Sequence, residues 1–121
     1  MKTRLVLHGL AIGEAPNLRL WSPPDPATVS VFVMASIGHR AAKKGTDNFT
    51  IRVATPNGLA VLTAKQGVLA QRPLLVIDTF EFDIIWQWFQ NLIEACDGPS
   101  WTECRDKLRR HLDWEFDYME A

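Results

Sequence analysis

The chain has 121 residues, 47% of them hydrophobic and 22% charged, with a formal net charge of -1 at pH 7. These values are typical of one globular domain with its own core, so we predict a single domain over residues 1–121. They exclude a disordered or fibrous chain. A net charge near zero also argues against direct binding to nucleic acid, since such binders attract phosphate with an excess of positive charge.

The charges are distributed unevenly along the sequence. Residues 1–60 contain seven lysines and arginines and three carboxylates, whereas residues 76–104 contain six carboxylates and no lysine or arginine. The acidic surface that this predicts is either a solvated helix face or a face directed at a basic partner. Complementary charge speeds the encounter between proteins and sets specificity.

The sequence has no evident membrane segment or secretion signal. No apolar run approaches the roughly 20 residues of a membrane-spanning helix. The first ten residues have only a short apolar stretch and no small-residue cleavage site, unlike a signal peptide. We therefore expect a cytoplasmic protein that does not enter a membrane.

The amino-terminal half predicts three strands. In residues 2–8, apolar and polar side chains alternate with a period of two, which indicates a half-buried strand. A connection rich in glycine and proline follows. Residues 29–37 have apolar side chains on both faces, which favours a position inside the sheet. Residues 49–54 form the third strand, after a positively charged loop at 38–47.

A short helix is expected over residues 57–66. Thr55-Pro56 is typical of an N-cap followed by a first turn, and Gly67 supplies the stop. We expect this helix to bury Leu59 and Leu62.

The next elements are a strand and a long helix. The continuous apolar run at 74–77 suits a strand in a central position. From about Thr79 to Asp97, large apolar residues recur at helical spacing and form one wide stripe. Asp78 and Glu81 have the spacing of a capping box at the start of this helix.

The carboxyl-terminal part predicts a second helix and a closing strand. Ser100 and Glu103 have capping-box spacing, and the helix that they open is expected to bury Trp101 and Cys104. Residues 114–118 alternate aromatic and acidic side chains, so a short strand or extended tail with inward-facing aromatics should follow. The fold class is therefore α+β: an antiparallel or mixed sheet of about four to five strands, packed on one face by two to three helices.

No arrangement of catalytic or metal-binding groups is recognisable. His8, His39 and His111 fall on separate elements, and none has a partner at ligand spacing. Cys96 and Cys104 are expected to be reduced and buried, and two cysteines without neighbouring histidines cannot complete a zinc site. The sequence has neither a G-x-S-x-G elbow nor a phosphate-binding glycine motif, so we predict no enzyme activity, metal or cofactor.

Two apolar residues of the long helix lie off its main stripe. Ile84 and Trp88 are four residues apart and rotated by roughly 100° from that stripe. They either pack under the second helix or remain exposed beside Glu81 and Asp83. In the second case they would form an aromatic anchor with an acidic rim, which is typical of a protein interface.

An ordered set of motifs completes the sequence evidence. It consists of Trp21-x-Pro23 before a long strand, Ala54-Thr55-Pro56 with Leu59 after it, Arg72-Pro73-Leu74-Leu75-Val76 leading into Phe80-Glu81-Phe82, and Ser100-Trp101-x-Glu103 to Trp114-Glu115-Phe116. In this set, which spans nearly the whole chain, the sequence resembles the immunity protein 8 family of bacterial polymorphic toxin and contact-dependent growth inhibition systems.

The resemblance implies a cytoplasmic inhibitor that binds the carboxyl-terminal toxin domain of a large neighbouring effector. Many delivered toxins are nucleases with basic grooves, so an acidic surface could occupy such a groove. The candidate toxin-binding residues are Asp78, Glu81, Asp83, Ile84, Trp88, Glu94, Asp113, Glu115 and Asp117. The alternatives are a small adaptor or regulatory domain that binds another protein, and a small enzyme with a polar cleft.

Overall fold

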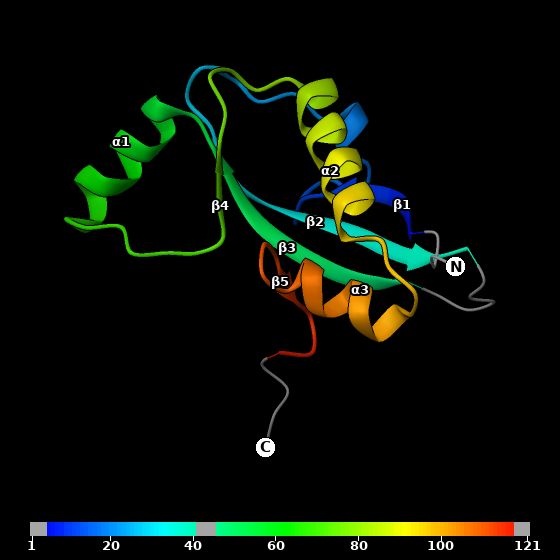
Figure 1. Ribbon diagram of the computed structural model, residues 1–121. Coiled ribbons are helices and arrows are strands. Elements are labelled where there is room, and N and C mark those ends of the chain that lie inside the picture. Colours follow the sequence, from blue (N-terminus) through cyan, green and yellow to red (C-terminus); the bar gives the residue numbers. More distant parts are fainter. Residues whose placement is uncertain (1–4, 41–45, 118–121) are drawn as a thin grey trace.

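The computed structural model describes residues 5–40 and 46–117 and has an α+β architecture (Figure 1). The strands are β1 (Leu5–Ala11), β2 (Ser30–His39), β3 (Asp47–Ala54), β4 (Leu74–Val76) and β5 (Asp113–Trp114). The helices are the 3-10 turn η1 (Leu18–Leu20), α1 (Pro56–Gln66), α2 (Phe82–Cys96) and α3 (Trp101–Leu108). The expected α+β class is confirmed.

The five strands form one mixed sheet in the order β1-β2-β3-β4, with β5 also paired to β3. The β1–β2 and β2–β3 pairs are antiparallel, whereas β4 runs parallel to residues 52–54 of β3. β5 pairs antiparallel with residues 49 and 50 of β3. β4 and β5 therefore share one edge of β3, and β2 has the expected interior position between β1 and β3.

In the part of the chain that the structure describes, helices cover only one face of the sheet. Val33, Ala35 and Phe49 point to the covered face and are fully buried. α2 and α3 pack there, on the same side of the sheet in Figure 1, with α2 over the β1 side and α3 over the start of β3, where Trp101 packs against Phe49. The other face of β2 is open, with Phe32 48% and Met34 38% exposed. The apolar pattern on both faces of β2 thus marks an interior strand with one uncovered face.

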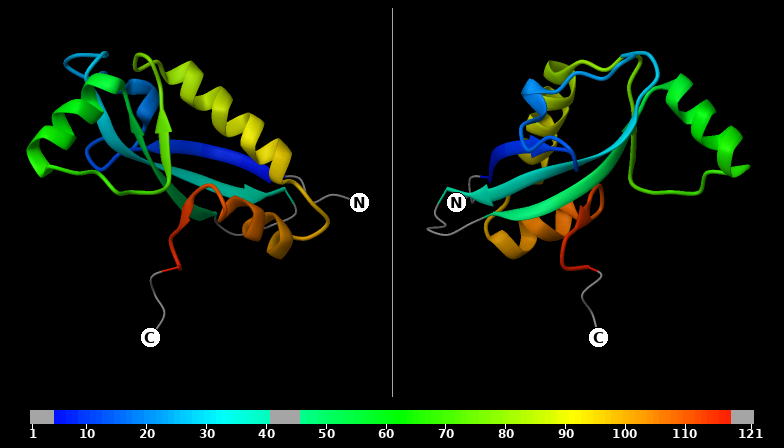
Figure 2. Two further views of the ribbon diagram at one scale, coloured as in Figure 1. Left: turned by 60° about the vertical axis from the view of Figure 1, so that its left-hand side comes forward. Right: turned by 180° about the vertical axis from the view of Figure 1, so that it is seen from behind.

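The first helix does not add to this covering layer. α1 stands beyond the end of the sheet in all three views (Figures 1 and 2). Its only buried residue is Gly58, in the first turn, so the expected burial of Leu59 and Leu62 is wrong. Their side chains are half-buried because only the first turn of α1 reaches the body of the protein.

A buried hydroxyl joins α1 to the start of β2. The Oγ1 atom of Thr55 accepts hydrogen bonds from the backbone N–H groups of Val29 (2.9 Å) and Gly58 (3.1 Å), and donates to the Ala27 carbonyl (2.7 Å). A Cβ atom at Gly58 would lie 1.9 Å from the Val29 carbonyl oxygen, so only glycine permits this approach. The expected N-cap at Thr55 is confirmed and has a second role in the core.

Two strands differ from the expectation. β4 is an edge strand of three residues and not a central one, because its only partner among the described residues is β3. β1 continues beyond the predicted end at residue 8, as far as Ala11, through an irregularity between Leu7 and Gly9. Residues 1–4 and 41–45, which include part of the predicted strand and loop, lie outside the described residues.

The start of α2 also differs. The helix begins at Phe82, and its N-cap residue Glu81 makes no side-chain cap hydrogen bond. The predicted capping box of Asp78 and Glu81 is therefore wrong. The chain stays extended up to this point because Phe80 is buried, donates its N–H to the Pro26 carbonyl (2.8 Å) and packs edge-on against Trp21.

The elements after α2 are close to the prediction. Ser100 caps α3 by accepting a hydrogen bond from the Glu103 N–H (3.2 Å), and Cys104 is fully buried. The closing strand is only two residues long. Phe116 packs edge-on against Trp114 but is 42% exposed, so the expectation that all the aromatic residues of this segment face inward is wrong. Tyr118 lies outside the described residues.

Replacing Thr55 with valine should lower the free energy of unfolding by about 2–4 kcal/mol, because two buried N–H groups and one carbonyl lose their partner. Thr55→Ser keeps the hydroxyl and loses one methyl, so it should cost about 1 kcal/mol. Urea denaturation followed by tryptophan fluorescence measures both values. Equal losses in the two variants would show that the hydrogen bonds contribute nothing beyond packing.

Candidate functional site

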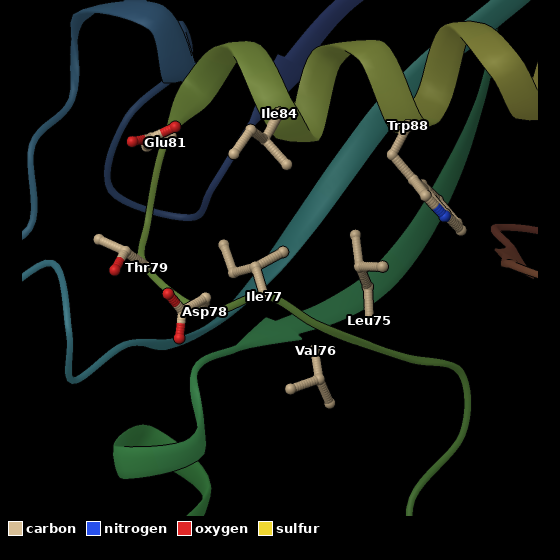
Figure 3. A pocket seen from close by; sticks show the side chains of 8 residues that line it. All are labelled: Leu75, Val76, Ile77, Asp78, Thr79, Glu81, Ile84 and Trp88. Carbon is tan, nitrogen blue, oxygen red and sulfur yellow. The ribbon is translucent and has the colours of Figure 1, made fainter.

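A groove of about 340 Å³ lies between the edge strand β4 and helix α2 (Figure 3). Its lining consists of Leu75, Val76, Ile77, Asp78, Thr79, Glu81, Ile84 and Trp88. Four of these eight residues belong to the candidate binding set drawn from the sequence. The structure thus brings Asp78, Glu81, Ile84 and Trp88 to one surface.

The apolar part of the groove follows from the pleat of β4 and the rotation of α2. Leu75 and Ile77 point toward the helix, whereas Val76 points the other way (Figure 3). Ile84 and Trp88 stand one helical turn apart and face the strand across the groove. Strand and helix therefore form the two apolar walls.

Ile84 and Trp88 are exposed to different degrees. Ile84 is 50% exposed, and Trp88 is half-buried with its ring edge-on to Phe89 (centroids 5.1 Å apart). The Trp88 indole nitrogen has no hydrogen-bond acceptor among the described residues. Ile84 thus matches the exposed alternative, whereas Trp88 is packed partly against the core and partly lines the groove.

One end of the groove is acidic. Asp78 and Glu81 are exposed there, and neither side-chain carboxylate has a hydrogen bond or ion pair with any described residue. Asp83 follows in the first turn of α2, where a carboxylate also stabilises the helix dipole, and its nearest cation is Arg19 at 4.0 Å. Within the described residues, no cation neutralises the carboxylates of Asp78 and Glu81, so they remain available to a partner.

The other four predicted residues lie elsewhere. Glu94 is exposed near the carboxyl end of α2, 13 residues after Glu81, which is about 20 Å along the helix axis. Asp113 is paired with Thr50 in the short strand β5. Glu115 accepts a hydrogen bond from the Asn48 N–H (2.6 Å), and Asp117 forms an ion pair with Arg109 (2.5 Å). Glu115 thus holds the closing turn to β3, and Asp117 holds it to the end of α3.

The open face of the sheet carries a second hollow, which sequence reasoning missed. This space of about 600 Å³ is lined by Phe32, Met34 and the polar side chains beside them, together with residues 11–13 and Pro16. The Arg52 guanidinium lies 4.2 Å from the centre of the Phe32 ring and bonds to Ser30 and Gln71. The missed signal was the apolar pattern on both faces of β2.

The three histidines lie on different segments of the structure. His8 lies on β1 and His111 after α3, both exposed, whereas His39 ends β2 and lies against Trp101 with the ring centroids 5.6 Å apart. Within residues 5–40 and 46–117, no three His, Cys, Asp or Glu side chains gather as a metal site requires. In the same residues, no helix is long and apolar enough to cross a membrane.

Both cysteines are free and buried. Burial raises the pKa of the Cys96 and Cys104 thiols, and the weak hydrogen bond from the Cys104 thiol to Asp97 acts in the same direction. A raised pKa keeps the thiol protonated at neutral pH, whereas a nucleophile or redox cysteine needs the thiolate.

Both thiols should therefore resist a disulfide reagent such as DTNB in the folded protein at pH 8, and both should react once the protein is unfolded in guanidinium. The folded-state rate should fall at least about tenfold below that of free cysteine, because burial limits both access and ionisation. Rapid modification of either thiol in the native protein would contradict the assignment to packing.

The groove combines apolar walls, a half-buried tryptophan and unpaired carboxylates at one end. Apolar side chains with a charged rim are typical of protein-binding surfaces. The chain belongs to the immunity protein 8 family, whose sequence profile, described as "Immunity protein 8", matches residues 5–118. No curated protein and no solved structure matches the chain at a significant level.

The motif residues that pointed to the family stabilise the fold. Trp21 packs against Phe80, and Trp101 packs edge-on to Phe49 at 6.4 Å. The Trp114 indole nitrogen donates a hydrogen bond to Asp47 (2.9 Å). Three of the motif residues, Leu75, Val76 and Glu81, also line the groove.

Proposed function

We propose that this protein neutralises a cognate toxin domain by binding it through the groove between β4 and α2. Membership of an immunity protein family supports the toxin as the partner. The groove supports the location, because it places apolar anchors next to carboxylates that have no described partner inside the fold. The protein would act in the cytoplasm of the producing cell, on the carboxyl-terminal domain of a large effector from a contact-dependent or similar system.

The charge at the groove indicates which surface of the toxin it fits. Asp78, Glu81 and Asp83 lie together at the start of α2, and residues 76–104 contain no lysine or arginine. An acidic surface attracts a basic one, and a toxin that cleaves nucleic acid needs a basic groove for its substrate. The proposal is therefore occlusion of a basic active site or of the surface next to it.

The direct test is co-expression with the toxin domain encoded by the neighbouring effector gene. This protein should restore growth to cells that produce the toxin domain, and the two should purify together. Failure of both would exclude the immunity function and leave a binding domain unrelated to toxins.

Reversing two charges at the groove should slow association with the toxin domain. We expect Asp78→Lys with Glu81→Lys to lower the association rate about tenfold or more at low salt, and to reduce its dependence on NaCl, because the electrostatic attraction is lost. The matched control is Glu14→Lys with Glu94→Lys, which makes the same change in net charge at two exposed positions outside the groove. Equal effects of the two double variants would rule out the groove as the charged contact.

Trp88 should dominate the binding energy. Replacing Trp88 with alanine removes a half-buried aromatic ring from the wall of the groove and should weaken binding by about 2 kcal/mol or more, or roughly 30-fold in Kd. Val61→Ala, at an exposed apolar residue of α1, should leave affinity unchanged. Calorimetric titration measures both affinities, and thermal unfolding confirms that each variant is folded.

A further inference from the structure

The outer edge of β4 carries unpaired backbone groups. The Pro73 carbonyl accepts a hydrogen bond from the Arg52 N–H (3.3 Å), and the Ile77 N–H donates to the Ala54 carbonyl (2.9 Å). These odd-numbered residues direct their backbone groups toward β3. Because backbone direction alternates along a strand, the N–H and C=O groups of Leu74 and Val76 point outward. No described strand pairs with that edge.

The opposite edge of the sheet is protected, and the β4 edge is not. β1 has a register irregularity between Leu7 and Gly9, and α2 packs across it. Bulges of this kind are a common protection against pairing with another chain. β4 has no irregularity or inward-pointing charge, and α1, the neighbouring helix, stands away from the sheet (Figures 1 and 2).

Apolar side chains flank this edge on both sides. Leu75 and Ile77 face the groove with Ile84 and Trp88 (Figure 3). Val76 points to the other side and is 49% exposed, and Leu74 is exposed there too. An added strand would therefore find apolar surface for its side chains on both of its faces.

The two ends of the edge carry opposite charges. At the start of β4, Arg72 and Arg110 line a small polar pocket next to Pro73, and neither has an ion pair with a described residue. Arg109 and the acidic Asp113 line the same pocket, which leaves it with an excess of positive charge. At the other end lie the unpaired carboxylates of Asp78 and Glu81. A fully extended chain from residue 72 to residue 78 would span at most about 20 Å, so the two charged ends lie within reach of one short strand.

We propose that an extended segment of the toxin binds along the outer edge of β4 and continues the sheet as an additional strand. The segment has apolar residues in its middle, basic residues beside Asp78 and Glu81, and acidic residues beside Arg72 and Arg110. Its backbone bonds to the outward groups of Leu74 and Val76, and one set of its alternate side chains fills the groove against Trp88. This proposal rests on the proposed function and adds the mode of binding to it.

Replacing Val76 with proline tests the backbone contact. Proline removes the outward N–H and leaves the hydrogen bonds between β4 and β3 intact, and edge strands tolerate it at such a position. Val76→Ala is the matched control, because it removes the side chain and keeps the N–H. Binding of the toxin domain by Val76→Pro should be about tenfold weaker than by Val76→Ala. Equal affinities of the two folded variants would overturn strand addition.

Amide hydrogen exchange in the unmodified protein gives an independent measurement. In the complex with the toxin domain, the amides of Leu74 and Val76 should exchange at least about tenfold more slowly than in the free protein. The Ile77 amide, already bonded to Ala54, is the internal reference. Unchanged exchange at both outward amides would overturn the proposal even if Val76→Pro failed to fold.

The charge pattern of the segment is tested at the basic end. Arg72→Glu should weaken binding about threefold or more, whereas Arg40→Glu, an exposed position at the far end of β2, should have no effect. Binding that is lost with Asp78→Lys and Glu81→Lys but unaffected by Val76→Pro and Arg72→Glu would leave the immunity function standing without strand addition. No binding by the unmodified protein would overturn both.

Discussion

The buried hydroxyl of Thr55 is the joint on which the arrangement of the sheet depends. β3 ends at Ala54, and the next residue must satisfy two backbone N–H groups and one carbonyl that no strand ladder reaches. An unpaired polar group in a protein interior costs as much as several ordinary contacts contribute. The Thr55 side chain provides the hydrogen-bond partner for backbone groups at both the start of β2 and the start of α1. Their relative position is therefore fixed by a local chemical requirement.

The position of β4 follows from that joint. With α1 directed away from the sheet at its first turn, the chain must return from outside to lie parallel to β3. The returning strand comes to the edge that β5 also uses, so only three of its residues pair. The segment from Asp78 to Glu81 is then drawn across to α2 by the burial of Phe80. The groove and its acidic end result from this path.

Sequence periodicity predicted the elements whose structure depends on near neighbours. The stripe of α2 and the Ser100 cap of α3 are confirmed, since both rest on spacings of three and four residues. Periodicity failed for elements whose position or boundary depends on contacts with residues far away in the sequence. The run at 74–77 reads as a central strand because a buried strand and a short edge strand flanking an apolar groove have the same composition. Likewise, Asp78 and Glu81 have capping-box spacing, but the distant contact of Phe80 with Trp21 keeps the chain extended there.

The candidate site was predicted in part for the same reason. Ile84 and Trp88 were found because rotation around a helix places them off the buried stripe. The acidic residues near the carboxyl terminus resemble those at the groove in sequence. Glu115 nevertheless bonds to Asn48, 67 positions earlier, and Asp117 to Arg109. Only the folded chain distinguishes a carboxylate with an internal partner from one without. The outward backbone groups of β4 have no side-chain signature at all.

Because β5 comes last in the sequence, part of the edge of β3 stays uncovered until late in the synthesis of these residues. β3 is complete at Ala54, but the strand that covers the rest of its edge begins at Asp113, 59 residues later. At ribosomal speeds of about 5–20 residues per second, this interval takes roughly 3 to 12 s, and further residues must leave the exit tunnel. Until then the nascent chain lacks Leu108 and Leu112, which are fully or almost fully buried in the core. A newly made molecule thus cannot complete its core or cover this edge of β3 before Leu112 and β5 have been synthesised, although the first three strands are already present.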